Sequence, residues 1–379
     1  MTEAIDRLRL ARSEGVGPVT YRRLLRRYGK AGAALDALPA LARAGGKAEA
    51  PAIPSASVAR QEIEKLERLG GRLLFLDTPD YPPLLALLDD APPVLSLLGD
   101  PAILAKRAVA LVGSRNASAN GQRIAEALAA ELAESGVAVA SGLARGIDTA
   151  AHRGALRAGA TIACVAGGVD VAYPPENADL QVRIVSEGAV VAEAPLGTAP
   201  QARHFPRRNR IIAGLSLGVV VVEAAPRSGS LITARLAQEA GRELFAVPGS
   251  PLDPRCRGSN GLIRDGAHLT ETAADVLDNL PDHPLREGIG RSPLFARGPT
   301  PERMAEPGPD FSDMADLPAG ERGAIHARLL ELLGPSPVAV DDLIRRCGFP
   351  AAAVNGVLLD LEIAGRIETL PGNRVALLS

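Results

Sequence analysis

The fold is decided by a stretch in the first third of the chain, Ala108-Val109-Ala110-Leu111-Val112-Gly113-Ser114-Arg115-Asn116. It begins with five apolar residues in a row and ends in a glycine-containing polar turn. An unbroken apolar run of this length is typical of a strand that is buried on both faces of a sheet. Further runs of the same kind occur at Val137–Ala140, Thr161–Ala166, Ala189–Ala192, Gly218–Val222 and Leu244–Val247.

Helical patterns separate these runs, at Gln122–Ser135, Thr149–Ala158, Glu176–Ser186 and Leu231–Ala240. Valine-rich strands that alternate with single helices predict a mostly parallel sheet with right-handed crossovers. We therefore predict an α/β fold for residues 72–282, an extended Rossmann-like sheet that is doubly wound, with helices on both faces. Ligands of such sheets bind beyond the carboxyl ends of the strands, so the turns after the strands are the first candidates for a functional site.

Smaller segments are expected around this sheet. Residues 1–66 contain short amphipathic helices, and a Gly15-Val16-Gly17-Pro18 turn lies between helices that carry arginines. Such a turn is typical of a helix-hairpin-helix, which binds phosphates through backbone amides at a helix N-terminus. The alternative is a small SAM-like helical bundle with a basic, solvated face. Residues 283–320 are rich in Pro, Gly and charged residues and are expected to form a linker.

A winged-helix domain is expected at residues 321–379. Its three helical patterns are Glu321–Leu333, Val340–Arg346 and Ala351–Ala364. A hairpin around residues 371–373 follows them, as in a winged helix. The third helix has no Lys or Arg and carries Asp360 and Glu362, which would repel phosphates in a major groove. We therefore expect this domain to contact a protein, or to touch duplex DNA with Arg366 and Arg374 in the wing.

Four of the turns after the predicted strands are rich in Gly or Ser, namely Gly113–Asn116, Ser141–Asp148, Gly167–Asp170 and Ser228–Thr233. Such turns are expected to expose backbone amides and to let a phosphate approach closely. Arg115 and Arg145 add guanidinium groups to the same edge, so the sequence predicts an anionic ligand there. Asp148 is a candidate for catalysis, but we expect it to be the N-cap of its helix, and we expect His152 to be a packing or surface residue.

The most basic segment of the chain is Arg203-His204-Phe205-Pro206-Arg207-Arg208-Asn209-Arg210, which we expect to be a polar loop. It holds four arginines, one aromatic residue and no acid. Guanidinium groups suit phosphate because each is a planar fork of donors, and Phe205 offers a face on which a base can stack. The alternatives are a solvated basic loop without function, or a Phe205 side chain that fills the core beneath Ile211 and Ile212.

Composition limits the classes of function. The net charge is −2, so any site for a polyanion must be a local patch. The three cysteines are far apart and have no metal-ligand spacing. No G-x-G-x-x-G follows the first strand, and the chain contains no P-loop and no H-E-x-x-H sequence, so we expect no dinucleotide, other cofactor or metal. The N-terminus lacks a signal-peptide pattern and no apolar run could span a bilayer, so we expect a cytoplasmic protein.

Taken as a set, these motifs resemble the DNA-processing protein A family, DprA/Smf. The resemblance covers most of the chain. The motifs that carry it are Tyr81–Leu85, Ala91–Leu95, Val112–Arg115, Ser141–His152, Gly167–Pro174, Phe205–Ser216 and Val247–Gly249. It implies an extended Rossmann fold that forms a homodimer. It also implies a cytoplasmic, non-enzymatic protein that binds single-stranded DNA and loads the RecA recombinase onto it, chiefly in natural transformation.

The resemblance also implies which residues would bind DNA. By motif they are Arg115, Gly142, Arg145, Gly146, Phe205, Arg207, Arg208 and Arg210, with Phe205 stacking on a base. The same turns and basic segment add Gly113, Ser114, Ser141, His204 and Asn209 as candidates. No catalytic residue and no metal ligand are expected.

Two other interpretations stay open. One is an enzyme on the same sheet, a nucleotide-cleaving protein that resembles the phosphoribohydrolases. Glu223, Ser228-Gly229-Ser230 and Thr233 stand where such a motif would lie, and Asp170 also follows a strand. The other is a structural adaptor for a protein partner, which would have no affinity for nucleic acid.

Overall fold

The structure is a computed structural model, and it describes the chain except for residues 1, 48, 160, 282–318, 371–372 and 379. The predicted linker, 283–320, lies outside the described residues except for its last two, which begin α14 (Ala319–Leu332). The chain divides into two compact units, one made of Met1–Gln61 with Pro299–Ser379 and one made of Glu62–Gly298. No helix in the described ranges is both long and apolar enough to cross a membrane.

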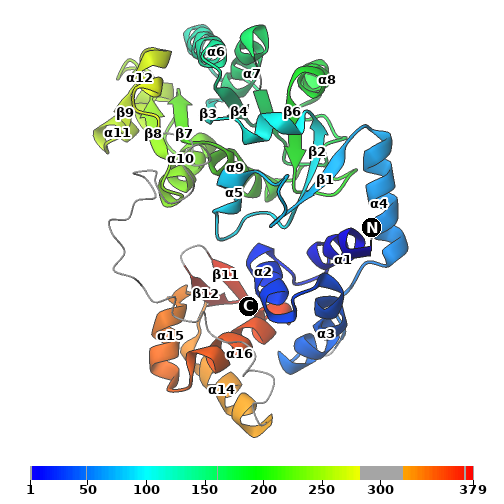
Figure 1. Cartoon of the computed structure of the whole chain (residues 1–379). Helices are drawn as coiled ribbons and strands as arrows, with labels where there is room; N and C mark the ends of the chain where they lie inside the picture. Colours follow the sequence, from blue (N-terminus) through cyan, green and yellow to red (C-terminus); the bar gives the residue numbers. More distant parts are fainter. Residues whose placement is uncertain (1, 48, 160, 282–318, 371–372, 379) are drawn as a thin grey trace. The chain divides into compact units, whose positions relative to one another are not determined.

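The central unit is built on a nine-stranded sheet in the order β1-β2-β6-β5-β4-β3-β7-β8-β9 (Figure 1). Its strands are β1 (Arg72–Phe75), β2 (Val94–Gly99), β3 (Ala108–Gly113), β4 (Ala138–Ser141), β5 (Thr161–Cys164), β6 (Ala189–Ala192), β7 (Gly218–Val222), β8 (Glu243–Ala246) and β9 (His268–Leu269). The strands from β3 to β9 pair in parallel, whereas β2 pairs antiparallel with both β1 and β6. The predicted Rossmann-like, mostly parallel sheet is confirmed, and β1, β2 and β9 are strands that the sequence analysis did not identify.

Helices cover both faces of this sheet. The helices of the central unit are α5 (Pro83–Ala86), α6 (Ala119–Glu134), α7 (Ile147–Ala158), α8 (Ala178–Glu187), α9 (His204–Leu215), α10 (Gly229–Glu239), α11 (Arg257–Arg264) and α12 (Ala273–Leu277). The helix α4 (Ala56–Arg68) begins in the terminal unit and ends in the central one. Alternate residues of β3 point to opposite faces, as strand geometry requires. Ala108, Ala110 and Val112 pack with α9 and α10, while Val109 and Leu111 pack with α6 and α7.

The basic segment is a helix, so the expectation of a loop was wrong. Residues 204–215 form α9, and the buried positions Arg208, Ile211, Ile212 and Leu215 have the i, i+3, i+4, i+7 spacing of a helix face. Pro206 lies in the first turn, where its missing N–H breaks no intrahelical hydrogen bond. Ile211 and Ile212 belong to the apolar core and Phe205 does not, which contradicts the alternative that Phe205 fills the core beneath them.

The terminal unit combines N-terminal helices with a winged helix. Its N-terminal helices are α1 (Thr2–Ala11), α2 (Pro18–Tyr28) and α3 (Ala31–Ala44). The winged helix consists of α14, α15 (Val340–Cys347), α16 (Ala351–Ile363) and the antiparallel strands β10 (Val338–Ala339), β11 (Ile367–Leu370) and β12 (Arg374–Leu377) in the order β10-β12-β11. Three helices followed by a hairpin were predicted here, and the short β10 was not.

The third helix of the winged helix, α16, packs against the N-terminal helices. Leu359 and Ile363 of α16 lie in the apolar cluster formed by α1, α2 and α3. A Cβ atom on Gly45 would overlap the Asp360 carbonyl oxygen, so only glycine allows this approach. Asp360 is 1% exposed and accepts hydrogen bonds from Arg322 Nε (3.0 Å) and Nη2 (2.5 Å), and burial raises the pKa of this carboxyl. The two acidic side chains of α16, Asp360 and Glu362, therefore contact arginines of the same unit.

Reversing one charge at this contact should lower the stability of the terminal unit. Arg23 Nη1 of α2 lies 3.6 Å from Glu362 Oε2 of α16, and both side chains are largely buried. Arg23→Glu or Glu362→Arg should each destabilise this unit by about 1–2 kcal/mol, between the values for surface and buried pairs. The double reversal should recover most of the loss in urea unfolding. Arg345→Glu, in the exposed pair with Asp342, is the control. If the double reversal loses the sum of the two single losses in free energy of unfolding, the contact is contradicted.

His152 is a packing residue, one of the two roles expected from the sequence. Thr161 Oγ1 donates to the Val139 carbonyl (2.7 Å), so it must accept from His152 Nδ1, which lies 2.7 Å away. The Nε2 atom is buried without a hydrogen-bond partner. Burial lowers the pKa of His152 to about 3, so the ring is neutral at physiological pH.

This histidine should make the central unit sensitive to acid. The pKa of His152 in the folded protein lies below its unfolded value of about 6.5, so the neutral ring stabilises the fold fully above pH 6.5. Below that pH, the free energy of unfolding falls by about 1.4 kcal/mol per pH unit toward pH 3. The glutamine of His152→Gln does not titrate. Between pH 7.5 and pH 5, the free energy of unfolding of this variant should fall by about 2 kcal/mol less than that of the wild type. Urea unfolding of both proteins at the two pH values measures this difference, and equal losses would show that His152 is not responsible.

Candidate functional site

A cavity of about 160 Å³ opens at the carboxyl edge of the central sheet. Its walls come from the turns after β3, β4 and β5, from the segment between β6 and α9, and from the start of α9. Arginines and aromatic rings share this lining, which includes Arg115, Arg145, Tyr173, Phe205 and Arg208. The fold therefore brings together the Gly-rich turns and part of the basic segment, with lining residues as far apart in sequence as Arg115 and Arg208.

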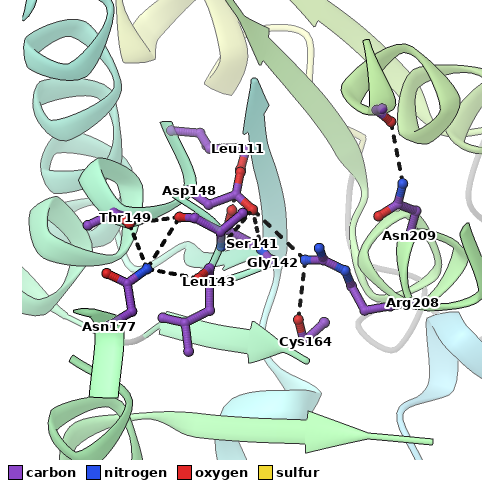
Figure 2. Close-up of polar contacts among 12 residues, drawn as sticks. Leu111, Ser141, Gly142, Leu143, Asp148, Thr149, Cys164, Asn177, Arg208 and Asn209 are labelled. Carbon is purple, nitrogen blue, oxygen red and sulfur yellow. Dashed lines mark hydrogen bonds and ion pairs between the residues drawn. The ribbon is translucent and has the colours of Figure 1, made fainter. Parts of the chain in front are cut away.

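At this cavity, a buried ion pair joins Asp148 of α7 to Arg208 of α9 (Figure 2). Arg208 is 5% exposed; its Nη1 lies 3.9 Å from Asp148 Oδ2 and donates to the Cys164 carbonyl (3.3 Å). Asp148 Oδ2 also accepts from the amides of Gly142 (3.1 Å) and Ala144 (3.3 Å). The Asp148 carboxylate therefore fixes the turn that precedes its own helix.

These contacts correct two expectations. Asp148 is not the N-cap of α7, because the helix begins at Ile147 and Gly146 occupies the cap position. The amides of Gly142 and Ala144 are not free for a ligand, because Asp148 accepts both. A Cβ atom on Gly142 would overlap Arg208 Nη1, so glycine is required here for the close approach of the guanidinium group.

Burial dominates the electrostatics of this pair. It raises the pKa of Asp148, against the opposing effect of Arg208 and the two amides. It also lowers the pKa of Arg208, against the opposing effect of Asp148. Each charge is thus costly to bury alone, and each needs the other inside the protein.

Asn177 supports the same turn and was missed in the sequence. Its Nδ2 donates to the Leu143 carbonyl and to Thr149 Oγ1, both at 2.9 Å, and Thr149 Oγ1 donates to the Ala144 carbonyl (2.7 Å) (Figure 2). Ser141, a candidate site residue, is buried and donates to the Leu111 carbonyl (2.6 Å). Nothing in the local pattern around Asn177 marks it, because its partners lie about 30 residues away.

The first candidate turn lies directly beside this one. Ser114 accepts the Ile147 amide with its carbonyl (3.2 Å), and its Oγ accepts the Asn116 amide (3.2 Å). Gly113 is the last residue of β3. Gly146 has a φ of +74°, and a Cβ atom there would overlap the Ser114 carbonyl oxygen. The candidate residues of both turns therefore pack against each other.

Four of the candidate arginines differ sharply in exposure. Arg115, Arg145 and Arg207 are exposed, whereas Arg210 is 7% exposed. Arg145 forms an exposed ion pair with Glu176, which contributes little to stability. Arg115 Cζ lies 4.8 Å from the centroid of the half-buried Phe205 ring, a cation–π contact.

Arg210 and Asn209 face the protein interior. Arg210 binds Glu193 through two parallel hydrogen bonds of 2.7 and 2.8 Å, and its Nε lies 3.2 Å from Asp90 Oδ2. Asn209 Nδ2 donates to the Gly229 carbonyl (3.3 Å). His204 is half-buried and its Nδ1 accepts the Gln201 amide (3.2 Å); burial and the neighbouring arginines lower its pKa.

The residues named for the enzyme interpretation make hydrogen bonds that stabilise the fold. Glu223 is buried, and its carboxylate accepts both the amide (2.8 Å) and the hydroxyl of Ser118, the N-cap of α6. Ser228 caps α10 by accepting the Ser230 amide (3.3 Å). Asp170 accepts the Gly197 amide (2.7 Å) and pairs with Lys65. Within the ranges that the structure describes, no group of three or more His, Cys, Asp or Glu residues could hold a metal.

Comparison with known proteins finds three matching family models. They are DNA recombination-mediator protein A at residues 72–281, the DprA-like N-terminal HHH domain at residues 1–64 and the DprA winged helix domain at residues 314–373. Protein Smf of Escherichia coli is 40% identical over 327 residues, which are 85% of this chain and 82% of that protein. DNA processing protein DprA of Bacillus subtilis is 42% identical over 209 residues, 55% of this chain and 70% of that protein.

Two solved structures are also similar. The X-ray structure of DprA from Streptococcus pneumoniae has a TM-score of 0.58 and 41% identity, and covers 61% of this chain and 80% of that one. The structure of DNA processing protein A from Helicobacter pylori is described for its single-stranded DNA binding mode. It has a TM-score of 0.50 and 30% identity, and the match covers 54% of this chain and 94% of that one. The chain described here belongs to the DNA recombination-mediator protein A family, DprA/Smf.

Proposed function

We propose that this protein binds single-stranded DNA, without strong sequence preference, at the cavity on the carboxyl edge of the sheet. The observation that carries the proposal is the placement of exposed arginines beside aromatic rings around one cavity. A single strand offers phosphates at regular spacing and bases with open faces. Sequence-tolerant binding therefore needs cations along a groove and an aromatic surface for stacking. The Helicobacter pylori relative, described for its single-stranded DNA binding mode, supports the same interpretation.

The geometry suggests a division of labour among the candidate residues. Arg115, Arg145 and Arg207 are exposed and are the phosphate contacts in this proposal. Phe205 is the base contact, and a base that stacks on the covered ring face must displace the Arg115 guanidinium group. The remaining candidates hold these side chains in place, and they are Gly113, Ser114, Ser141, Gly142, Gly146, His204, Arg208, Asn209 and Arg210.

The contacts favour binding over nucleotide cleavage. A nucleotide-cleaving enzyme on this sheet would need a free carboxylate near the ligand. Glu223, the candidate for that role, has one oxygen on the Ser118 amide and the other on the Ser118 hydroxyl. We therefore propose a protein without catalytic activity of its own, a DNA-binding mediator.

The finer steps of the proposal follow from the family. We propose that the protein loads the RecA recombinase onto bound single-stranded DNA, as in natural transformation, and that it works in the cytoplasm. We further propose a homodimer through the Rossmann-like domain, because the exposed basic patch of one protomer is short. Light scattering on the intact protein measures the mass of that dimer.

Arg115→Ala should weaken binding to a single-stranded oligonucleotide and flatten its dependence on salt. Loss of a charge-assisted contact should lower affinity by about tenfold or more. The slope of log affinity against log salt should fall by about 0.7 for each phosphate contact that is lost. Fluorescence anisotropy across a salt series measures both. Arg235→Ala, at an exposed ion pair on α10, is the matched control, and an unchanged slope for Arg115→Ala would reject the phosphate contact.

The loading step can be measured separately. On single-stranded DNA coated with a single-strand binding protein, this protein should shorten the lag before RecA hydrolyses ATP. Arg115→Ala should lose this effect in proportion to its loss of DNA affinity. A wild-type protein that binds the strand tightly but leaves the lag unchanged would reject RecA loading and leave DNA binding intact.

A further inference from the structure

The terminal unit contains a contact between an acidic helix and a basic one. The helix α16 carries Asp360 and Glu362 and no basic residue, whereas α2 carries four arginines and no acidic residue. Arg23 Nη1 of α2 lies 3.6 Å from Glu362 Oε2. Burial raises the pKa of Asp360, and the positive charges of Arg322 and Arg27 oppose that rise, so Arg27 of α2 also lies near this carboxylate. The two acids of α16 therefore neutralise arginines of α2.

The same helix covers the turn between α1 and α2. A Cβ atom on Gly15 in this turn would lie 2.7 Å from the carbonyl oxygen of Ile363, the last residue of α16. Leu359 and Ile363 also pack into the apolar cluster of the N-terminal helices. The turn has the sequence of a phosphate-binding hairpin, and Gly17 caps α2 without a side-chain hydrogen bond. The helix α16 thus lies over the turn and beside the arginines that follow it.

Two features allow this contact to open without unfolding either part. The winged helix has an apolar core of its own, and the α16 residues that pack against the N-terminal helices do not belong to it. The charged contact is also incompletely hydrogen-bonded. Among the described residues, one nitrogen each of Arg23 and Arg27 and one carboxylate oxygen of each α16 acid are buried without a hydrogen-bond partner. Unmade hydrogen bonds on buried charged groups weaken a contact, so a better partner can displace α16.

The surface that α16 covers suits phosphate groups. Arg23 and Arg27 are four positions apart in α2, so they are neighbours on one face of this helix. Arg26 and the nearby Lys30 are exposed. A guanidinium group donates two parallel hydrogen bonds to one phosphate, and a nucleic-acid backbone presents its phosphates in series. These cations can therefore bind the backbone of duplex DNA once the α16 carboxylates are removed from them.

We propose that α16 is an autoinhibitory element that covers a second DNA-binding site, formed by the turn between α1 and α2 and by the arginines of α2. The carboxylates of α16 take the place of backbone phosphates while the contact is closed, and duplex DNA binds there when it opens. This inference goes beyond the proposed function, because the site lies in the terminal unit and recognises the backbone without stacking on a base. It also explains why the third helix of this winged helix is acidic.

The test opens the contact in the full-length protein without changing its net charge. Leu359→Asn removes an apolar side chain from the contact, and Gly45→Val places a side chain where a backbone carbonyl oxygen of α16 lies. Each variant should bind a duplex oligonucleotide about tenfold more tightly than the wild type, as measured by fluorescence anisotropy at low salt. Adding Arg23→Ala and Arg27→Ala to Leu359→Asn should abolish this gain. Gly323→Ala on α14, where a Cβ atom has open space around it, is the control.

Small-angle scattering on the same samples shows whether the contact is open, as a radius of gyration larger than that of the wild type. The inference fails if an expanded variant binds the duplex no more tightly than the wild type, if the gain survives loss of the two arginines, or if neither variant expands. The two substitutions lie on opposite sides of the contact, so if one variant melts early the other decides. If both melt early, the contact is needed for folding and the inference is wrong. Single-strand binding at the cavity of the central unit is measured separately, so none of these results bears on the proposed function.

Discussion

The buried ion pair between Asp148 and Arg208 is the constraint on which the candidate site depends. It joins α7, the turn after β4, the end of β5 and α9 at one point at the cavity. Removing one partner of a buried pair costs about 3–5 kcal/mol, because the other charge is left without compensation. The exposed side chains of the edge are thus presented by a turn and a helix that cannot move independently of each other.

Arginine serves two different purposes in the basic segment. Arg208 and Arg210 point inward and hold α9 in place, the first through Asp148 of α7 and the Cys164 carbonyl of β5, the second through its paired hydrogen bonds to Glu193. Arg203 and Arg207 stay exposed at the start of the same helix. The inward pair explains how a helix with so polar a first half can lie on an apolar core, since its cations are neutralised on the buried side. The local charge that remains outside is therefore smaller than the count of arginines in the sequence indicates.

The sequence predicted the interior of the sheet well and its tertiary contacts poorly. The ends of six strands were predicted to within about two residues, because a strand that is buried on both faces has an unbroken run of apolar residues in its sequence. The edge strands β1 and β9 are short, with partly exposed residues, and lack that signal. The helix α9 was missed because Arg208 was not counted as a buried position, although it completes the helical spacing with Ile211, Ile212 and Leu215. The partners of Asp148 and the exposure of Tyr173 depend on segments distant in sequence, which no local pattern contains.

Under the proposed function, phosphate recognition and base recognition are physically linked at this edge. In the free protein the Arg115 guanidinium group lies over Phe205 and covers part of that ring. An exposed cation–π contact contributes about 0.5–1 kcal/mol, whereas a charged hydrogen bond to phosphate contributes about 1.5–3 kcal/mol. A phosphate that binds Arg115 can therefore draw the guanidinium group away from the ring. Under the proposed function, the first contact with the backbone therefore uncovers part of the Phe205 ring for the base.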